Sequence, residues 1–448
     1  MHVRVGSARV DITPPLTIPY LGLMPRQAYF TGVHDPLFAR ALVFDDGRER
    51  AALVCADAIG LGNHILGPGR SFTSELRARI ERRCGLRGDH VMVSSTHAHS
   101  TPETLGITRL GDVPAAAPWL EALLDHLASA VAMACDDTRP CALKVGTGLV
   151  PGVARNRRPA WQGLSLEDQA ARGRLDPQLQ VLLCEDQEGN ARQVLLNFQC
   201  HPVTVQVQPM VSADYPGAAV EMVRRGLPGC RDCLFLQGAA GNLNPVRDDT
   251  RDFRDVAVYG AMVADEALKV TARLLGGGVA PMEDVIVRSA SARVAVPPRA
   301  QPDRAEWERK LGDARALEQT AREERENLAA RQQLRDAQEV LDSMEHFGVP
   351  QEAEVQVVRI GDLAIASTPG EMFTEWGLKI KKESPSPHTF IAELANGWVG
   401  YLLNPGGFAE GGYEASPGPW TQTNEDGAAL LADTAIDLIR RLWPGRMR

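Results

Sequence analysis

The segment HVMVSSTHAHS, residues 90–100, joins a stretch typical of a β-strand to a cluster of polar side chains. Its first part, residues 90–95, is a short and mostly apolar run, which predicts a buried strand. Two histidines separated by one residue, His97 and His99, follow that strand directly. In open α/β sheets, ligands bind outside the carboxyl ends of the strands. The segment therefore predicts an α/β fold with a functional site at this strand end.

Three other apolar runs end in polar clusters in the same way. They are VLLNFQC (194–200) before His201, LFLQ (234–237) before GAAGNLNP (238–245), and LAIAS (363–367) before TPGE (368–371). Loops at strand ends can vary in sequence, while the strands keep the ends of each loop in fixed positions. We therefore expect the four clusters to contribute to one site.

Alternating apolar runs and helical patterns over the first 300 residues predict an α/β fold with layered mixed β-sheets and flanking helices. We expect hairpins at 181–184 with 194–198 and at 355–360 with 363–366, single strands at 52–56 and 234–237, and helices from Thr73 to a stop at Gly85, from Pro118, and over 428–443. No repeat or low-complexity linker divides the chain. We expect one domain over residues 1–448, without a C-terminal β-sandwich domain.

Residues 302–345 are rich in Glu, Arg, Gln and Ala and interrupt this pattern. Apolar positions recur at helical spacing, but their register slips near residues 329–332. This predicts a charged helical insertion of two amphipathic helices or one broken helix. We expect a surface excursion or a dimer contact rather than a lid over the site.

Composition narrows the functional class. The 448 residues are 44% hydrophobic and 23% charged, which is typical of a globular protein, and no apolar run is long enough to span a membrane. The formal net charge of −9 argues against a nucleic-acid-binding protein. The N-terminus lacks the pattern of a secretory signal, so we expect a cytoplasmic protein. A homo-oligomer remains open.

Histidines and a carboxylate at the strand ends suggest a metal site. On an extended backbone, residues two apart point the same way, so one of His97 and His99 can bind a metal while the other shuttles protons. With His201 and Glu371, two histidines and a carboxylate form a catalytic zinc set with an open position. The chain has no GxSxG motif, which favours water on a metal as the nucleophile.

Two other sequence features give weaker evidence for a role in a functional site. His34 lies in a predicted loop, where a structural hydrogen bond and a role in the site are both open. Cys230 and Cys233 form a lone CxxC motif, and a zinc knuckle would need a second pair. An amidohydrolase-type barrel also uses an HxH motif, but near its first strand, whereas 96 residues precede this one.

At these residues the chain resembles the catalytic domain of the neutral, non-lysosomal ceramidase family. The similar blocks, in order, are VGSARVDITP (5–14), GVHDPLFARA (32–41), STHAHS (95–100), VARNR (153–157), FQCHP (198–202), PGE (369–371), and NGWVGY with GGYE (396–401 and 411–414). The resemblance implies zinc ligands at His97, His201, Glu371 and Tyr401, an active-site arginine at Arg157 and an active-site tyrosine at Tyr413.

One departure from the family concerns the nucleophile. Asn244 stands where the family has a serine that is sometimes assigned that role, so covalent catalysis by that serine is excluded here. The missing β-sandwich and secretion signal favour a soluble intracellular substrate over ceramide itself.

The resemblance implies a Zn²⁺-dependent hydrolase that cleaves an amide of a small molecule or lipid by metal-activated water. We expect His99 to protonate the leaving amine, Arg157 or Tyr413 to stabilise the oxyanion, and Asn244 to hold the substrate or the water. Two alternatives remain: an enzyme that uses the same zinc site to form or cyclise an amide or ester, and a non-catalytic binding protein.

Overall fold

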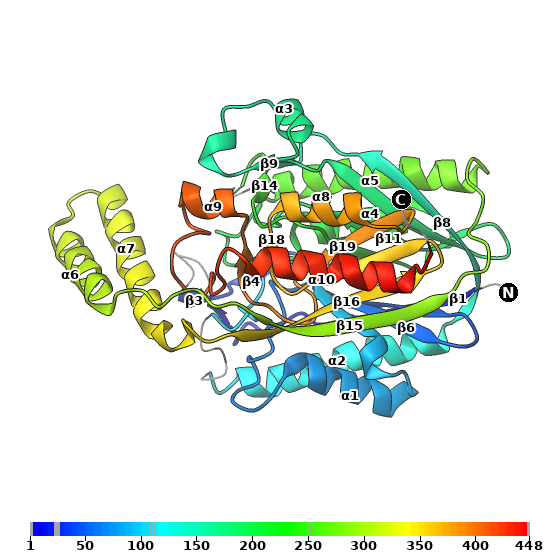
Figure 1. The fold of residues 1–448 in the computed structure, drawn as a ribbon, viewed down its shortest axis with the longest axis horizontal. Helices are drawn as coiled ribbons and strands as arrows, with labels where there is room; N and C mark the ends of the chain where they lie inside the picture. The colour runs from blue at the N-terminus through cyan, green and yellow to red at the C-terminus, as the bar shows by residue number, and fades with distance from the viewer. Residues whose placement is uncertain are drawn as a thin grey trace.

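Two β-sheets packed face to face, with helices on their outer faces, make up the body of the molecule (Figure 1). The structure is a computed structural model that describes residues 3–21, 27–107, 110, 113–248, 250 and 252–445. The strand order in the larger sheet is β13 (Asp232–Gln237), β11 (Ala191–Phe198), β10 (Gln178–Glu185), β8 (Arg139–Leu149), β1 (Val3–Asp11), β5 (Phe38–Asp45), β6 (Arg50–Ala56) and β7 (Val91–Ser95). Its two edge pairs, β6 with β7 and β11 with β13, are parallel, while the other pairs are antiparallel.

Alternating side chains give the larger sheet two apolar faces. In β6, Val54 points toward the helices, whereas Leu53 and Cys55 point toward the second sheet. Helices α1 (Phe72–Cys84) and α2 (Ala116–Asp136) cover the half of the sheet that contains β5, β6 and β7. Helices α4 (Asp214–Gly226) and α5 (Phe253–Leu275) cover the half that contains β8, β10, β11 and β13.

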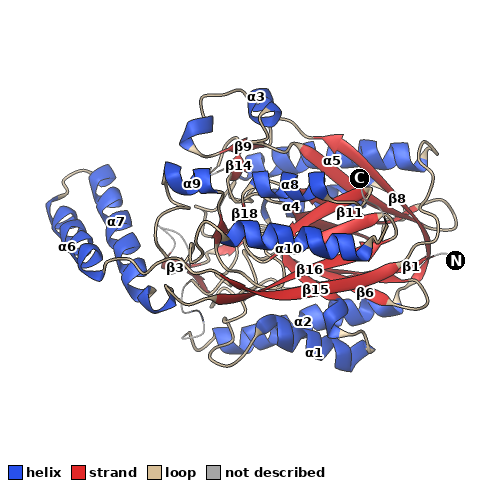
Figure 2. Ribbon diagram, in the orientation of Figure 1, coloured by secondary structure: helices blue, strands red, loops and turns tan. Residues whose placement is uncertain are grey.

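The second sheet completes a four-layer α/β/β/α arrangement (Figure 2). Its strand order is β15 (Val287–Val296), β16 (Gln351–Ile360), β17 (Leu363–Thr368) and β19 (His388–Glu393). Ile360, Leu363 and Phe390 pack inward against the larger sheet. Helices α8 (Thr374–Glu383) and α10 (Gly427–Leu442) cover the outer face. The predicted fold class of layered mixed sheets with flanking helices is confirmed.

Short elements beyond the strand ends surround the site. They include the pairs β18 (Glu371–Met372) with β20 (Tyr401–Leu402), β9 (Ala154–Asn156) with β14 (Leu243–Pro245), β12 (Met210–Val211) with β4 (Gly32–Val33), and β2 (Pro19–Leu21) with β3 (Gln27–Tyr29). The short helices are α3 (Leu166–Ala171), α9 (Pro405–Glu410), η1 (Gly88–His90), η3 (Pro159–Trp161) and η4 (Met344–His346). Because β19 packs beside both β7 and β13, the carboxyl ends of strands from both sheets meet.

Helices α6 (Arg304–Thr320) and α7 (Glu324–Asp342) form an arm that projects away from the sheets (Figure 1). The predicted break at residues 329–332 is wrong, because these residues lie inside α7. The helices part at residues 321–323, where Glu323 and Glu326 form a capping box that starts α7. The two groups of apolar positions lie on separate helices, α6 and α7, which pack against each other, so they share no single register.

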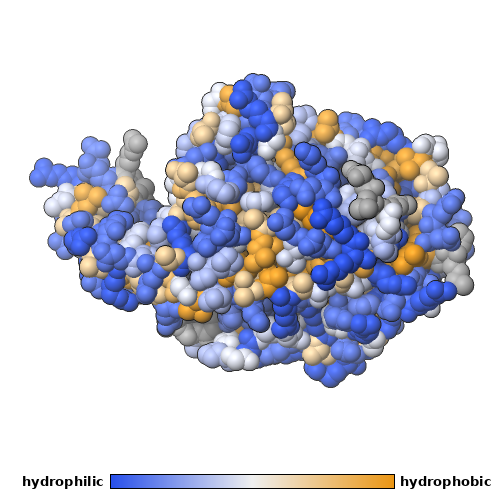
Figure 3. Space-filling view, viewed as in Figure 1, coloured by the Kyte–Doolittle hydropathy of each residue, from blue (hydrophilic) through white to orange (hydrophobic). Residues whose placement is uncertain are grey.

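The other predicted elements are present, with ends shifted by up to four residues, the largest shift being the start of β16 at Gln351 instead of residue 355. The helix expected from Pro118 begins at Ala116, and the helix expected from Thr73 begins at Phe72 and ends before Gly85. The face drawn in Figure 3 is mainly hydrophilic. Within the described part of the chain, no helix combines the length and apolar character needed to cross a bilayer.

Candidate active site

His97 lies just beyond β7 in the left-handed backbone region, with φ of 68°. The expectation that His97 and His99 sit on an extended backbone is therefore wrong. The two imidazoles nevertheless meet, since their Nε2 atoms lie 3.2 Å apart. Their proximity arises from the sharp turn at His97 rather than from strand alternation.

Backbone carbonyls fix the orientation of two buried imidazoles. His97 Nδ1 lies 2.5 Å from the carbonyl oxygen of Ile59, and His201 Nδ1 lies 2.7 Å from that of Ala240. A carbonyl oxygen only accepts, so each Nδ1 carries the hydrogen and each Nε2 presents a lone pair. These two Nε2 atoms face one another at 3.0 Å. Neither nitrogen can donate to the other in this tautomer.

A carboxylate joins the two imidazoles. Glu371 Oε2 lies 3.2 Å from His201 Nε2 and 3.4 Å from His97 Nε2. The indole Nε1 of Trp398 donates to the other oxygen, Oε1, at 3.1 Å. All three potential ligands are at most 3% exposed. Three acceptors thus converge without a hydrogen to share, which is an arrangement that a cation satisfies.

The spacing of these atoms fits zinc. Zn–N and Zn–O bonds of roughly 2.0–2.1 Å in tetrahedral geometry separate the ligand atoms by about 3.3 Å. The three separations among His97, His201 and Glu371 range from 3.0 to 3.4 Å. Histidines 97, 99 and 201 also form the group of potential metal ligands found in the described part of the chain.

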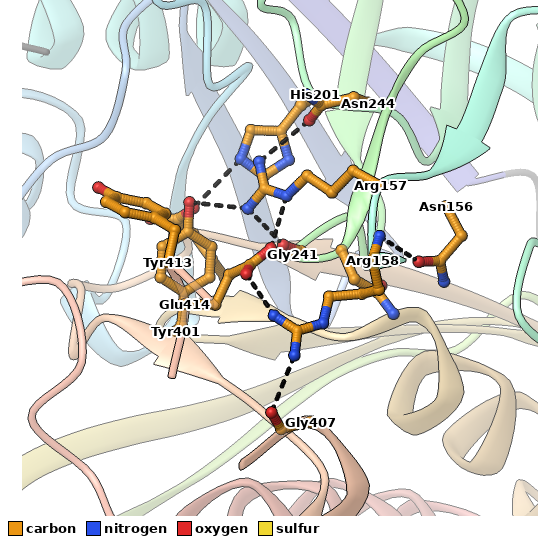
Figure 4. Close-up of polar contacts among 12 residues, drawn as sticks. Asn156, Arg157, Arg158, His201, Gly241, Asn244, Tyr401, Gly407, Tyr413 and Glu414 are labelled. Carbon is orange, nitrogen blue, oxygen red and sulfur yellow. Dashed lines mark hydrogen bonds and ion pairs between the residues drawn. The ribbon is translucent and has the colours of Figure 1, made fainter. Parts of the chain in front are cut away.

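The β18–β20 pair brings a tyrosine to the same place. Glu371 and Tyr401 are register partners in this ladder, so their side chains leave neighbouring backbone positions. The Tyr401 hydroxyl accepts a hydrogen bond of 3.0 Å from Arg157 Nη2. Figure 4 shows His201, Arg157 and Tyr401 directed toward a common space, with the ring of Tyr413 beside that of Tyr401.

Arg157 connects four parts of the site. Its Nε donates to Glu414 at 2.7 Å, and its Nη1 donates to Asn244 Oδ1 at 3.0 Å. Its Nη2 donates to the Gly241 carbonyl at 2.8 Å as well as to Tyr401. The Gly241 loop also packs closely against the backbone of Glu371. This approach needs glycine, because a Cβ at residue 241 would lie 2.4 Å from the Glu371 carbonyl oxygen.

Asn244 uses both ends of its amide within the protein. Its Oδ1 accepts from Arg157, and its Nδ2 donates to Asp248 at 2.6 Å. The residue that replaces the family's serine therefore holds the arginine in place. These contacts favour a positioning role over the expected contact with substrate or water.

Burial and charge set the protonation of the ligands. Burial, followed by the positive charge of Arg157, lowers the pKa of His201 to about 4, so this imidazole is neutral at pH 7. Burial would raise the pKa of Glu371, but His97 and His201 hold it well below its usual value. A neutral imidazole and an ionised carboxylate are the forms that bind metals.

Loss of solvent around the hydroxyl also raises the pKa of both tyrosines, although Tyr413 as a whole residue is 37% exposed. For Tyr401 the opposing effect is the charge of Arg157. For Tyr413 the negative charges of Glu371, Glu339 and Asp336 add to the effect of burial. The last two carboxylates belong to α7, so the arm approaches the site on the side of Tyr413.

Several residues of the site were not predicted from the sequence. Arg158 is 2% exposed and donates to Glu414 at 2.5 Å and to the carbonyls of Gly407 and Gly411 at 2.9 and 2.5 Å. Arg158 thereby fixes the loop that carries Tyr413. The sequence offered two features that could have indicated this contact. They are the adjacent arginines 157 and 158 and the glutamate that follows Tyr413.

Two other sequence features lie apart from these contacts. His34 Nδ1 pairs with Asp35 at 2.7 Å, and its ring stacks on Phe253 at 3.7 Å, which favours a structural role. Cys233 is buried, Cys230 is half-buried, and both are free thiols. Cys230 Sγ contacts the carbonyl of Asp232 at 3.4 Å.

Comparisons with known proteins show which family the chain is similar to. Residues 3–231 match the family model described as neutral/alkaline non-lysosomal ceramidase, N-terminal. A neutral ceramidase of Drosophila melanogaster is 36% identical over 103 residues, and that of Drosophila pseudoobscura pseudoobscura is 37% identical over 101 residues. Each alignment covers 22% of this chain and only 14% of the relative.

Solved structures show the same fold. The crystal structure of neutral ceramidase from Pseudomonas aeruginosa superposes with a TM-score of 0.74 at 18% identity, over 99% of this chain and 74% of that chain. A structure described as ceramidase complexed with C2 gives the same TM-score and identity and is covered to 75%.

Proposed function

The chain belongs to the neutral/alkaline non-lysosomal ceramidase family, and from this we propose that it is a zinc-dependent amide hydrolase. His97, His201, Glu371 and Tyr401 would hold the zinc. The observation that carries the proposal is the convergence of two imidazole lone pairs and one carboxylate within 3.0–3.4 Å. Bound zinc would supply a Lewis acid for the amide carbonyl and would acidify water.

The surrounding residues have separate roles in this proposal. His99 Nε2 lies beside the centre and would deliver a proton to the leaving amine. Tyr413, whose ring lies edge-on against that of Tyr401, would donate to the oxygen that becomes negatively charged. The guanidinium of Arg157 is occupied by protein acceptors, so it would orient Tyr401 instead.

A cavity next to the site supports a substrate of small-molecule size. Its volume is about 880 Å³, and Trp398, which donates to Glu371, forms part of its wall. Glu339 and Asp342 of α7 also line it. Cavities of roughly 300–1,000 Å³ are typical of small-molecule sites. Because the lining combines apolar side chains such as Ile107 and Trp398 with the carboxylates of Glu339 and Asp342, we propose an amide that carries both polar and apolar groups as substrate.

The test is a panel of N-acyl amides assayed with protein that has been stripped of metal and then reloaded. We expect cleavage after zinc is restored and none before. His201→Ala should abolish both zinc binding and cleavage. His126→Ala, which removes an exposed histidine of α2, should change neither. Cleavage that survives metal removal would exclude the proposal.

A further inference from the structure

Glu393, the last residue of β19, is a buried carboxyl group for which the proposed mechanism has no use. Its side chain is 0% exposed. Oε2 accepts hydrogen bonds from the backbone N–H groups of Ala240 at 3.0 Å and Met372 at 3.1 Å. Oε1 is buried without a hydrogen-bond partner among the described residues. Glu393 thus spans two loops of the candidate site.

Each of these loops supports a proposed zinc ligand. The carbonyl of Ala240 receives the Nδ1 hydrogen of His201, and Met372 directly follows Glu371. The Gly241 N–H also donates to the Met372 carbonyl at 2.8 Å, so the two loops are joined beside Glu393. A single carboxyl group therefore fixes the backbone behind both a histidine and a carboxylate ligand.

The surroundings of Glu393 disfavour a negative charge. No lysine, arginine or histidine of the described residues forms an ion pair with it, and an unpaired buried carboxylate is costly. Burial raises its pKa well above the usual value, and the nearby charge of Glu371 adds to this effect. Hydrogen bonds from two backbone N–H groups and from the side chain of Gln237 oppose the effect only in part. The neutral acid still offers Oε2 as an acceptor to both N–H groups.

We infer that Glu393 is a positioning residue that works as a neutral carboxylic acid and holds the Ala240 and Met372 loops in register for zinc binding. This inference rests on the proposed function in that its effect is exerted on the zinc ligands. The side chain of Gln237 also approaches this carboxyl group, and its own Oε1 is buried.

Glu393→Gln tests the protonation state because glutamine has the shape of the neutral acid, with one acceptor and one donor end. We expect Glu393→Gln to keep zinc affinity within about threefold of the wild type. Glu393→Ala, which removes the acceptor, should lose 10–100-fold in zinc affinity, the range typical for residues that support metal ligands. Affinity is measured by competition with a chelator, and folding by circular dichroism. Glu188→Gln in the exposed β10–β11 turn is the matched control.

Infrared spectroscopy gives a second readout that does not depend on zinc. The wild type at neutral pH should show the carbonyl band of a protonated carboxyl group, and the difference spectrum against Glu393→Gln should contain that band. If Glu393→Gln weakens zinc binding as much as Glu393→Ala, or if the band is absent, the inference is wrong. Wild-type protein that shows the band but binds no zinc would instead overturn the proposed function.

Discussion

At the scale of single residues, the site depends on which nitrogen of each histidine faces inward. His97 and His201 both give their Nδ1 hydrogens to backbone carbonyls. Histidine ligands whose second nitrogen is held in this way are oriented before the metal arrives. We therefore expect His97 and His201 to act as ligands, and His99 keeps its proposed role as an acid beside them.

His99→Ala should retain about one zinc per chain and lose 10²–10⁴-fold in kcat, the range typical of a missing general acid or base. Elemental analysis and steady-state kinetics on the same preparation provide the two numbers. Loss of zinc along with activity would instead make His99 a third histidine ligand, as its place beside the other two also allows.

Arg157 illustrates a role that needs geometry as well as charge. Lysine keeps the charge but cannot reproduce a fork that reaches Glu414, Asn244, the Gly241 carbonyl and Tyr401. Arg157→Lys should lower kcat/KM by about 100-fold, or about 2.7 kcal/mol. Arg231→Lys, at a surface position, is the control and should have no effect. Equal activity of both variants would rule out the positioning role.

Residue types at the site were predictable, but their conformations and partners were not. His97, His201 and Glu371 were found because each follows an apolar strand in the sequence. The left-handed backbone of His97 was not predictable, since the pattern HxH fits an extended strand equally well. The pair of Arg158 with Glu414 spans 256 residues, and no local pattern specifies such a contact.

At the scale of elements, alternation and chain breaks predicted most strands and helices. Strands β7, β11, β13 and β17 are short apolar runs bounded by glycine, proline or polar residues, and local sequence suffices to find them. The strand order of the larger sheet was not predictable, because β13 joins β11 in parallel only after α4 crosses between them. The predicted position of the break between α6 and α7 was wrong. The capping box formed by Glu323 and Glu326 sets the start of α7, and the spacing of apolar residues does not reveal it.

Helix α4 carries an ion-pair cluster that predicts how the stability of the fold changes in acid. Glu221 accepts from Arg224 at 2.7 Å, from Arg225 at 2.5 Å and from Arg9 of β1 at 3.2 Å. Hydrogen bonding by Arg224 is the largest effect that lowers the pKa of Glu221, to about 2. A carboxyl with a lowered pKa in the folded state stabilises the fold above its unfolded pKa of about 4.3, and this contribution is lost as the pH falls toward 2.

Glu221→Gln should therefore lower the free energy of unfolding by about 1 kcal/mol at pH 7, a value reduced for solvent screening of a partly exposed group. The difference from the wild type should shrink as the pH falls from about 4.5 toward 2. Urea unfolding at a series of pH values measures it. A difference that stays constant over this range would show that the charge of Glu221 does not contribute.

At the scale of the whole molecule, two sheets bring distant strand ends together, and the arm adds a wall to the cavity beside them. The expectation of a surface excursion describes α6, while Glu339 and Asp342 of α7 line the cavity. Asp342→Leu should make the cavity more apolar and shift kcat/KM by about tenfold toward amides with longer alkyl chains. Zinc content should stay the same.

Asp313→Leu is the matched control, because Asp313 is an exposed aspartate of α6 in the same arm but is not part of the cavity lining. Competition between a short polar amide and a long-chain amide in one reaction gives the ratio directly. An identical ratio for the wild type and both variants would exclude the arm from substrate selection.

The most direct test of the account is the zinc content of the purified protein, measured by elemental analysis beside His97→Ala. The account predicts about one zinc per chain in the wild type and its loss in the variant, with the fold of the variant preserved by circular dichroism. A wild type that binds no zinc when the metal is supplied, or a variant that binds as much as the wild type, would contradict it.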